Sequence, residues 1–194
     1  MKGKKIVITG GAGFIGSNLA LALQEKFPYN EYFIIDNFSS SNAGNLEEFK
    51  GEVIQGSIQE IDLDKKFDVF FHQAAITDTT VSDRKIMMEN NVAGLENILN
   101  YCLKNKCKLI YASSASVYGH SQSPMIVGQN EQPANIYGES KLAADNIARK
   151  YFKDLPIVGL RYFNVYGPGE KYKGKMASQV WQLYLQMKGG QRPK

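Results

Sequence analysis

The amino-acid sequence predicts an α/β fold in which a doubly wound parallel sheet carries helices on both faces. Short apolar runs rich in β-branched and aromatic residues alternate with longer segments of helical pattern along the chain. A glycine-rich turn at residues 9–16 directly follows the first apolar run. Strand–helix alternation of this kind implies a parallel sheet, and right-handed crossovers then place helices on both of its faces.

Six strands and four helices are expected. The apolar run at residues 6–8 marks the core of the first strand, and the leucine- and alanine-rich stretch after residue 18 marks the first helix. Two polar segments, 37–45 and 120–135, are predicted as loops, and long loops in such folds often lie over a ligand. The strands are expected at 4–9, 31–36, 52–55, 67–72, 107–113 and 156–164, and the helices at 14–27, 84–105, 136–152 and 176–188.

Composition narrows the class of protein. The 194 residues are 43% hydrophobic and 22% charged, which is ordinary for a globular chain, and the net charge of +4 is mild. Because the basic residues are scattered, nucleic acid is not an expected partner, whereas a phosphate-bearing small molecule is. Two cysteines are too few for a zinc site, so no metal is expected, and reduced thiols favour the cytoplasm. No apolar stretch reaches the roughly 20 residues of a membrane span.

The glycine-rich turn predicts a dinucleotide site. Glycines at positions 10, 13 and 16 permit a tight turn, a close approach to a pyrophosphate and close helix packing, respectively. The helix that begins at Phe14 and Ile15 then offers free N–H groups to the phosphates. Asp36 follows Gly16 by twenty residues, where a carboxylate binds the adenosine ribose. Asn37 and the residues up to Asn42 carry no positive charge, and this pattern leans towards NAD over NADP.

A second set of residues predicts acid–base chemistry on an alcohol. Tyr137 and Lys141 are four residues apart at the start of a predicted helix, so they share one face. A nearby ammonium and a positive nicotinamide ring would lower the tyrosine pKa and make Tyr137 a base near neutral pH. Lys141 would also hold the nicotinamide ribose. Ser114 follows the fifth strand, where ligands of open parallel sheets bind, and Ser116 is the main alternative for the hydroxyl that contacts the reacting group.

These motifs together resemble the extended short-chain dehydrogenases/reductases that act on nucleotide sugars, the NAD-dependent epimerase/dehydratase family. The matching stretches are residues 9–16, 111–119, 137–141 and 161–168. Within that family, residues 72–75, 77–80, 87–91 and 172–178 are similar to the ADP-L-glycero-D-manno-heptose 6-epimerases, which serve lipopolysaccharide synthesis. The resemblance implies a Rossmann-type NAD(P)-binding domain over residues 1–168 and the start of a substrate-binding region over 169–194. We therefore expect the C-terminal substrate domain to be truncated, and the full-length form to be a homo-oligomer.

The resemblance also implies a mechanism and roles. Bound NAD(P) oxidises the secondary alcohol at carbon 6 to a ketone, and hydride returns to the other face. Such a reaction needs an acid–base group on each side of the carbon, and Tyr137 and Lys173 match these two positions. Heptose epimerases are associated with NADP, so both cofactors stay open here. Thr79, Ser114, Ser116 and Asn164 match substrate-contacting positions, and Ala74, Ala75 and Asn91 match positions at the cofactor.

Departures and alternatives remain. Gly169 stands where relatives often have Arg, and Ser57 stands where many have an acid near the adenine. A 4,6-dehydratase would need an Asp–Glu pair where this chain has Ala115 and Ser116, which counts against dehydration. A UDP-hexose 4-epimerase would show the same Ser, Tyr and Lys, and a truncated chain could also be a non-catalytic NAD(P)-binding module.

Overall fold

A computed structural model describes residues 2–60 and 65–193, and it confirms the doubly wound α/β fold. Six parallel strands form one sheet in the order β3-β2-β1-β4-β5-β6. The strands are β1 (Lys5–Thr9), β2 (Glu31–Asp36), β3 (Glu52–Gln55), β4 (Val69–His72), β5 (Lys108–Ser114) and β6 (Ile157–Tyr162). The chain winds outward in one direction from β1 to β3 and in the other from β4 to β6. The strand order therefore reverses between β1 and β4, where such sheets bind ligands beyond the strands' carboxyl ends.

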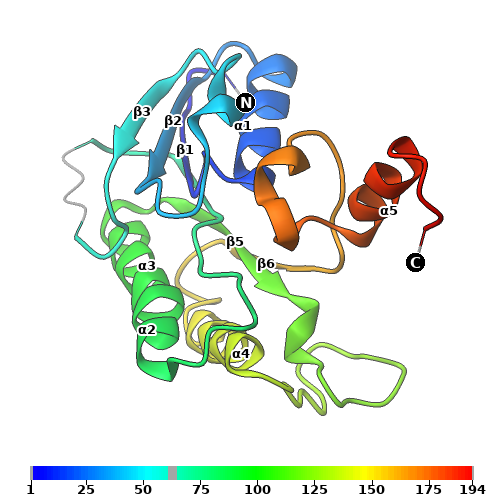
Figure 1. The fold of residues 1–194 in the computed structure, drawn as a ribbon. Coiled ribbons are helices and arrows are strands. Elements are labelled where there is room, and N and C mark those ends of the chain that lie inside the picture. Colours follow the sequence, from blue (N-terminus) through cyan, green and yellow to red (C-terminus); the bar gives the residue numbers. More distant parts are fainter. Residues whose placement is uncertain (1, 61–64, 194) are drawn as a thin grey trace.

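Helices cover both faces of this sheet (Figure 1). The helices are α1 (Phe14–Lys26), α2 (Arg84–Met88), α3 (Gly94–Asn105), α4 (Ile136–Arg149) and α5 (Gln179–Lys188). Side chains of α3 and α4 pack with β4 and β5 in one hydrophobic core, which includes Phe70, Leu99 and Ala148. Ala20 of α1 packs in a second core with alternate residues of the strands, such as Ile8 and Ile34. Successive strand residues face opposite sides of the sheet, and the nearly continuous apolar strands supply both cores.

The predicted elements differ from the structure mainly at their ends. The helix expected over 84–105 is present as α2, a π-helical turn at Glu89–Ala93 and α3. The last helix begins at Gln179, three residues later than expected, because a 3₁₀ segment at Glu170–Met176 precedes it. Short 3₁₀ segments also lie at Ala43–Leu46 and Ala115–Val117. No helix in the described parts of the chain is long and apolar enough to cross a membrane.

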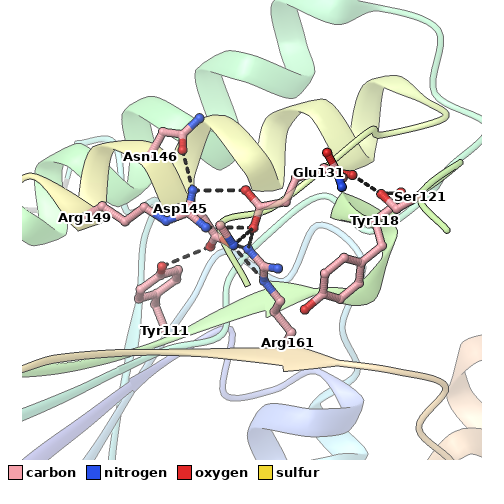
Figure 2. Close-up of polar contacts among 10 residues, drawn as sticks. Tyr111, Tyr118, Ser121, Glu131, Asp145, Asn146, Arg149 and Arg161 are labelled. Carbon is pink, nitrogen blue, oxygen red and sulfur yellow. Dashed lines mark hydrogen bonds and ion pairs between the residues drawn. The ribbon is translucent and has the colours of Figure 1, made fainter. Parts of the chain in front are cut away.

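A buried group of charges, here called the Arg161 cluster, joins β6, α4 and the 120–135 loop (Figure 2). The guanidinium of Arg161 donates to Glu131, and its Nη2 donates to Oδ2 of Asp145 at 2.8 Å. Arg149 donates to both carboxylate oxygens of Glu131 at 2.8 and 3.1 Å, and the Tyr111 hydroxyl donates to Asp145 at 3.0 Å. The side chains of Arg161, Glu131 and Asp145 are only 9%, 8% and 4% exposed. Two cations and two anions make the Arg161 cluster neutral overall.

Candidate active site

A cavity of about 840 Å³ opens at the carboxyl ends of the strands, and nearly all the predicted site residues line it. It is bounded by the glycine-rich turn, the segments after β2, β3 and β4, the end of β5, the first turns of α4, the end of β6 and the segment leading into α5. The structure therefore brings together residues spread over 160 positions of sequence. The predicted residues that line it are Gly10, Gly13, Phe14, Ile15, Gly16, Asp36, Asn37, Ala74, Ala75, Thr79, Ser114, Tyr137, Lys141, Asn164 and Lys173.

The glycine-rich turn has the shape of a phosphate cradle. Gly10 adopts a left-handed φ of +64°, and a Cβ there would lie 2.7 Å from the backbone of Ala74. A Cβ on Gly16 would lie 2.2 Å from the carbonyl oxygen of Gly10. Gly13 caps α1 without any side-chain hydrogen bond, so the first N–H groups of the helix are left for a ligand. The residues present thus fit the pyrophosphate of a dinucleotide.

Asp36 is fixed at the end of β2 by hydrogen bonds on both carboxylate oxygens. Its Oδ2 accepts from the backbone N–H of Ala12 at 2.9 Å, which ties it to the cradle. Its Oδ1 accepts from the N–H of Phe38 at 2.9 Å and the hydroxyl of Ser41 at 2.8 Å. Phe38 needs a left-handed φ of 56° to make this turn. Two backbone N–H groups and one hydroxyl therefore fix the carboxylate at the cavity wall, at the position where a carboxylate binds the hydroxyls of an adenosine ribose.

The two side chains predicted to take part in catalysis, Tyr137 and Lys141, lie at the start of α4. Asn135 caps this helix by accepting from the N–H of Gly138 at 2.8 Å, which places Tyr137 and Lys141 in its first turns. Lys141 Nζ donates to the carbonyl oxygen of Ala112 on β5 at 3.0 Å and lies 5.8 Å from the centroid of the Tyr137 ring. The end of β5 and the start of α4 are thus held together by the lysine itself.

Burial governs the protonation of these two groups. It raises the pKa of Tyr137, although a hydrogen bond with Ser114 opposes the shift. It lowers the pKa of Lys141 to about 8, although the charge of Asp145 opposes the shift. In the chain by itself the pKa of Tyr137 is raised, not lowered, because desolvation outweighs the hydrogen bond with Ser114. The expectation also counted the positive nicotinamide ring, which belongs to the ligand.

Two predicted site residues, Ser116 and Asn91, do not line the cavity but contact residues that do. Ser116 donates its hydroxyl to Ser114 Oγ at 2.7 Å and does not line the cavity, so the structure favours Ser114 for contact with the reacting group. Asn91 is also absent from the wall. Its amide donates to the carbonyl oxygen of Ile76 at 3.0 Å and to Ser140 Oγ at 3.0 Å, and it accepts from the N–H of Ile76 at 2.8 Å. It positions the loop after β4 against α4.

Lys173 lies on the 3₁₀ segment Glu170–Met176 and lines the cavity from there. Its Nζ is 5.2 Å from the centroid of the Phe14 ring at the start of α1. The buried carboxylate of Glu170 holds this segment in shape, because it accepts from the N–H of Gly167 and the N–H of Ser178, both at 2.6 Å. Hydrogen bonds of this carboxylate outweigh the effect of its burial and lower the pKa of Glu170.

The structure also adds cavity residues that the sequence did not single out, notably Gln73, Ser113 and Tyr162. Gln73 stands one position beyond β4 and Tyr162 ends β6, so the rule that ligands bind beyond strand ends could have suggested both. Across the described ranges 2–60 and 65–193, no group of three or more His, Cys, Asp or Glu side chains is placed to hold a metal ion. Both cysteines are free and buried.

The chain is similar to several known proteins that are named as epimerases. The chain is 41% identical to an ADP-L-glycero-D-manno-heptose-6-epimerase of Brachyspira hyodysenteriae, over 97% of this chain and 63% of that protein. The crystal structure of the Helicobacter pylori enzyme of the same name matches with a TM-score of 0.92 at 45% identity, over 96% of this chain and 63% of the other. A UDP-N-acetylglucosamine 4-epimerase from Methanobrevibacter ruminantium matches with a TM-score of 0.88 at 30% identity, over 98% and 64%.

The chain thus spans a little under two thirds of the length of these relatives. The family model described as the NAD dependent epimerase/dehydratase family matches residues 6–194, which include the glycine cradle and all the cavity residues named above. The chain belongs to the NAD dependent epimerase/dehydratase family.

Proposed function

We propose that this chain carries the cofactor site and the acid–base groups of a nucleotide-sugar epimerase of the ADP-glyceromanno-heptose 6-epimerase type. One observation carries the proposal: the glycine cradle, Ser114, Tyr137, Lys141 and Lys173 line a single cavity. Similarity to the heptose epimerases of two organisms supports the choice of sugar. Because the chain spans only part of those relatives, epimerisation is proposed for the protein to which this part belongs.

The side chains divide the work of such a reaction among them. A nicotinamide cofactor held by the glycine cradle and Lys141 would supply the acceptor for a hydride from the secondary alcohol of the sugar, and the donor of that hydride to the other face of the ketone. Ser114 and Tyr137 offer hydroxyls to the reacting oxygen, and Tyr137 exchanges the proton. Lys141, held by Ala112, keeps Tyr137 and the cofactor ribose in place. Lys173 approaches from a separate segment and supplies the second acid–base group that inversion requires.

We further propose that the cofactor is NAD. Among the described residues that line the cavity, Lys141 and Lys173 are the cations, and both belong to the catalytic end in this proposal. Lys50, the first cation after Asp36, lines a separate depression of about 1030 Å³ between α1 and β2–β3. A 2′-phosphate beside Asp36 would therefore meet a carboxylate and hydroxyls in place of a positive charge. Solved relatives of about 30% identity were crystallised with NAD.

Calorimetric titration with NAD and NADP tests the cofactor site, after retained nucleotide has been removed. We expect micromolar binding with NAD preferred, whereas tighter NADP binding would overturn the Asp36 argument. Comparing the conversion of ADP-heptose with that of UDP-galactose tests the substrate, because it distinguishes a heptose epimerase from a hexose epimerase. Tyr137→Phe is expected to keep the affinity for NAD within about threefold and to reduce turnover at least 100-fold, since general acid–base groups contribute about 10²–10⁴. Equal turnover in Tyr137→Phe would refute its role.

A further inference from the structure

Lys173, the proposed second acid–base group, stands on a segment with little regular structure of its own. Residues 167–178 lie between β6 and α5, and they contain the 3₁₀ segment at Glu170–Met176. The backbone leaves helical geometry at Gly174, where φ is +54° and ψ is −125°. Hydrogen bonds of a 3₁₀ helix have poorer geometry than those of an α-helix, and such helices are short. Side-chain contacts are therefore needed to fix the position of Lys173.

A single carboxylate closes this segment. One oxygen of Glu170 accepts from the N–H of Gly167 and the other accepts from the N–H of Ser178, both at 2.6 Å. Because these donors are eleven positions apart, the carboxylate joins the two ends of the segment. Glu170 is only 2% exposed, and hydrogen bonds to an ionised acceptor are stronger than those between neutral groups. Asn18 of α1 donates to the carbonyl oxygen of Pro168 at 2.8 Å, which ties the first end to the helix of the glycine cradle.

The closed segment presents Lys171 and Lys173 differently. Lys173 is partly buried and lines the cavity, and its Nζ lies 5.2 Å from the centroid of the Phe14 ring. Lys171 is exposed and does not line the cavity. Lys173 is also near enough for its charge to stabilise the ionised carboxylate of Glu170. Glu170 therefore acts on Lys173 both through the backbone that it closes and through its charge.

We propose that Glu170 is a positioning residue, which holds the Lys173 ammonium at the cavity by closing residues 167–178. This inference rests on the proposed function, in which Lys173 is the second acid–base group. Such a group has to lie within hydrogen-bond reach of the reacting atoms, and a misplacement of about 1 Å can cost about 100-fold in rate. In Glu170→Gln the side chain keeps its size, but its NH₂ group faces one of the two N–H donors, so one of the two hydrogen bonds is lost.

A double-mutant cycle in the full-length protein to which this chain belongs tests whether Glu170 acts through Lys173. Glu170→Gln is expected to reduce the kcat for ADP-heptose about 10- to 100-fold and to leave KM within about threefold. Lys173→Met should reduce kcat at least about 100-fold, and adding Glu170→Gln to it should change kcat by less than about twofold. Lys171→Met is the matched control: it should keep normal turnover, and Glu170→Gln should lose as much kcat in that background as it does alone.

Trace acetylation of lysines, measured by peptide mass spectrometry, follows the position of the ammonium without any turnover. Glu170→Gln should raise the labelling rate of Lys173 relative to that of exposed Lys171 at least about twofold, because the partly buried lysine becomes exposed. Ser178→Pro is a second variant that removes one N–H donor, and the Ser178 φ of −60° suits proline. Ser178→Ala keeps this N–H and lacks the same hydroxyl, so Ser178→Pro should reproduce both effects relative to Ser178→Ala.

The outcomes separate the possible failures. An equal loss of kcat from Glu170→Gln with and without Lys173 would show a purely structural role and overturn the inference. An unchanged kcat in Glu170→Gln, or an unchanged labelling ratio, would overturn it as well. If Lys173→Met keeps normal turnover, the proposed acid–base role of Lys173 fails and the inference fails with it. If the protein does not convert ADP-heptose, the proposed substrate fails, and the labelling ratio then decides whether Glu170 places Lys173.

Discussion

Removal of the Arg161 guanidinium should destabilise the chain much more than removal of its neighbour Arg149. In Arg161→Ala, two carboxylates that are 8% and 4% exposed lose their shared cation. Breaking a buried ion pair by deleting one partner costs about 3–5 kcal/mol. Glu131 keeps Arg149 and Asp145 keeps the Tyr111 hydroxyl, so we expect the lower end, about 3 kcal/mol. For a chain of this size, this lowers the melting temperature by roughly 6–12 °C.

Urea unfolding at pH 7, followed by far-ultraviolet circular dichroism, measures this loss. Arg149→Ala is the control, because its side chain is 29% exposed and an ion pair at such a site contributes about 1 kcal/mol or less. If the free energy of unfolding of Arg161→Ala falls by less than about 1 kcal/mol, or by no more than that of Arg149→Ala, the Arg161 cluster does not stabilise the fold as its geometry indicates. Adding Glu131→Gln and Asp145→Asn to Arg161→Met should restore part of the stability, since the unpaired charges are then removed.

The same cluster predicts how acid weakens the fold. Burial alone would raise the pKa of Glu131, but hydrogen bonds from Arg149, Gly128 and Arg161 outweigh burial and hold the pKa at about 2, below the ordinary 4.5. A carboxyl whose pKa is lower in the folded state stabilises the fold above pH 4.5, and this contribution is lost as the pH falls from about 4.5 to 2. In Arg161→Ala the folded pKa of Glu131 should rise towards 4.5, so the contribution is smaller and the less stable chain should unfold at a higher pH, which acid titration followed by circular dichroism would show.

Two further predictions concern the cavity. Gly16→Ala should reduce NAD affinity at least about 100-fold in calorimetry, because the added Cβ would lie 2.2 Å from the Gly10 carbonyl oxygen and force the cradle open. The control is Gly189→Ala, where the nearest atom to the added Cβ lies at 3.4 Å, and this variant should bind NAD normally. Lys141→Met should stabilise the chain at pH 7 by up to roughly 3 kcal/mol, because burial lowers the Lys141 pKa from 10.5 to about 8 and so penalises the charged form in the folded state. That advantage should shrink as the pH rises from about 8 to 10.5, where both the folded and the unfolded lysine become neutral, and an advantage that is constant between pH 7 and 10 in urea unfolding would contradict the assignment.

The fold was predictable because local patterns in the sequence mark its strands and helices. Apolar runs of strand length are separated by helical patterns, and each of the six expected strands is present within two residues of its predicted bounds. The 3₁₀ segment at Glu170–Met176 was not predicted, because its shape depends on a single buried carboxylate that bonds to both of its flanks. Such a contact produces no periodic pattern of hydrophobic residues in the local sequence. The π-helical turn at Glu89–Ala93 was missed for a similar reason, since Asn91 is held there by Ile76 and Ser140 from other segments.

The candidate site was predictable where a residue type is tied to a motif, and less so where its role depends on contacts across the sheet. The glycines, Asp36, Tyr137 and Lys141 all lie where their spacing placed them. Gln73 carried no signal beyond its place at a strand end, because the burial of its amide beside Tyr162 is a property of the packed structure. Likewise, the choice between Ser114 and Ser116 required coordinates, since both follow the same strand within three residues.

The protonation of Tyr137 shows why the folded site has to be considered with its ligand. The Lys141 ammonium and the expected nicotinamide ring suggested a favoured phenolate, but burial raises the tyrosine pKa above its ordinary 10.0 and lowers the lysine pKa from 10.5 to about 8, so the two pKa values move apart. The protein thus favours the neutral form of both groups, so formation of a phenolate beside the lysine ammonium costs more than it does in water. Any further stabilisation of the phenolate has to come from positive charge brought by the ligand. We therefore infer that Tyr137 acts as a base only when a bound ligand brings that positive charge to the site.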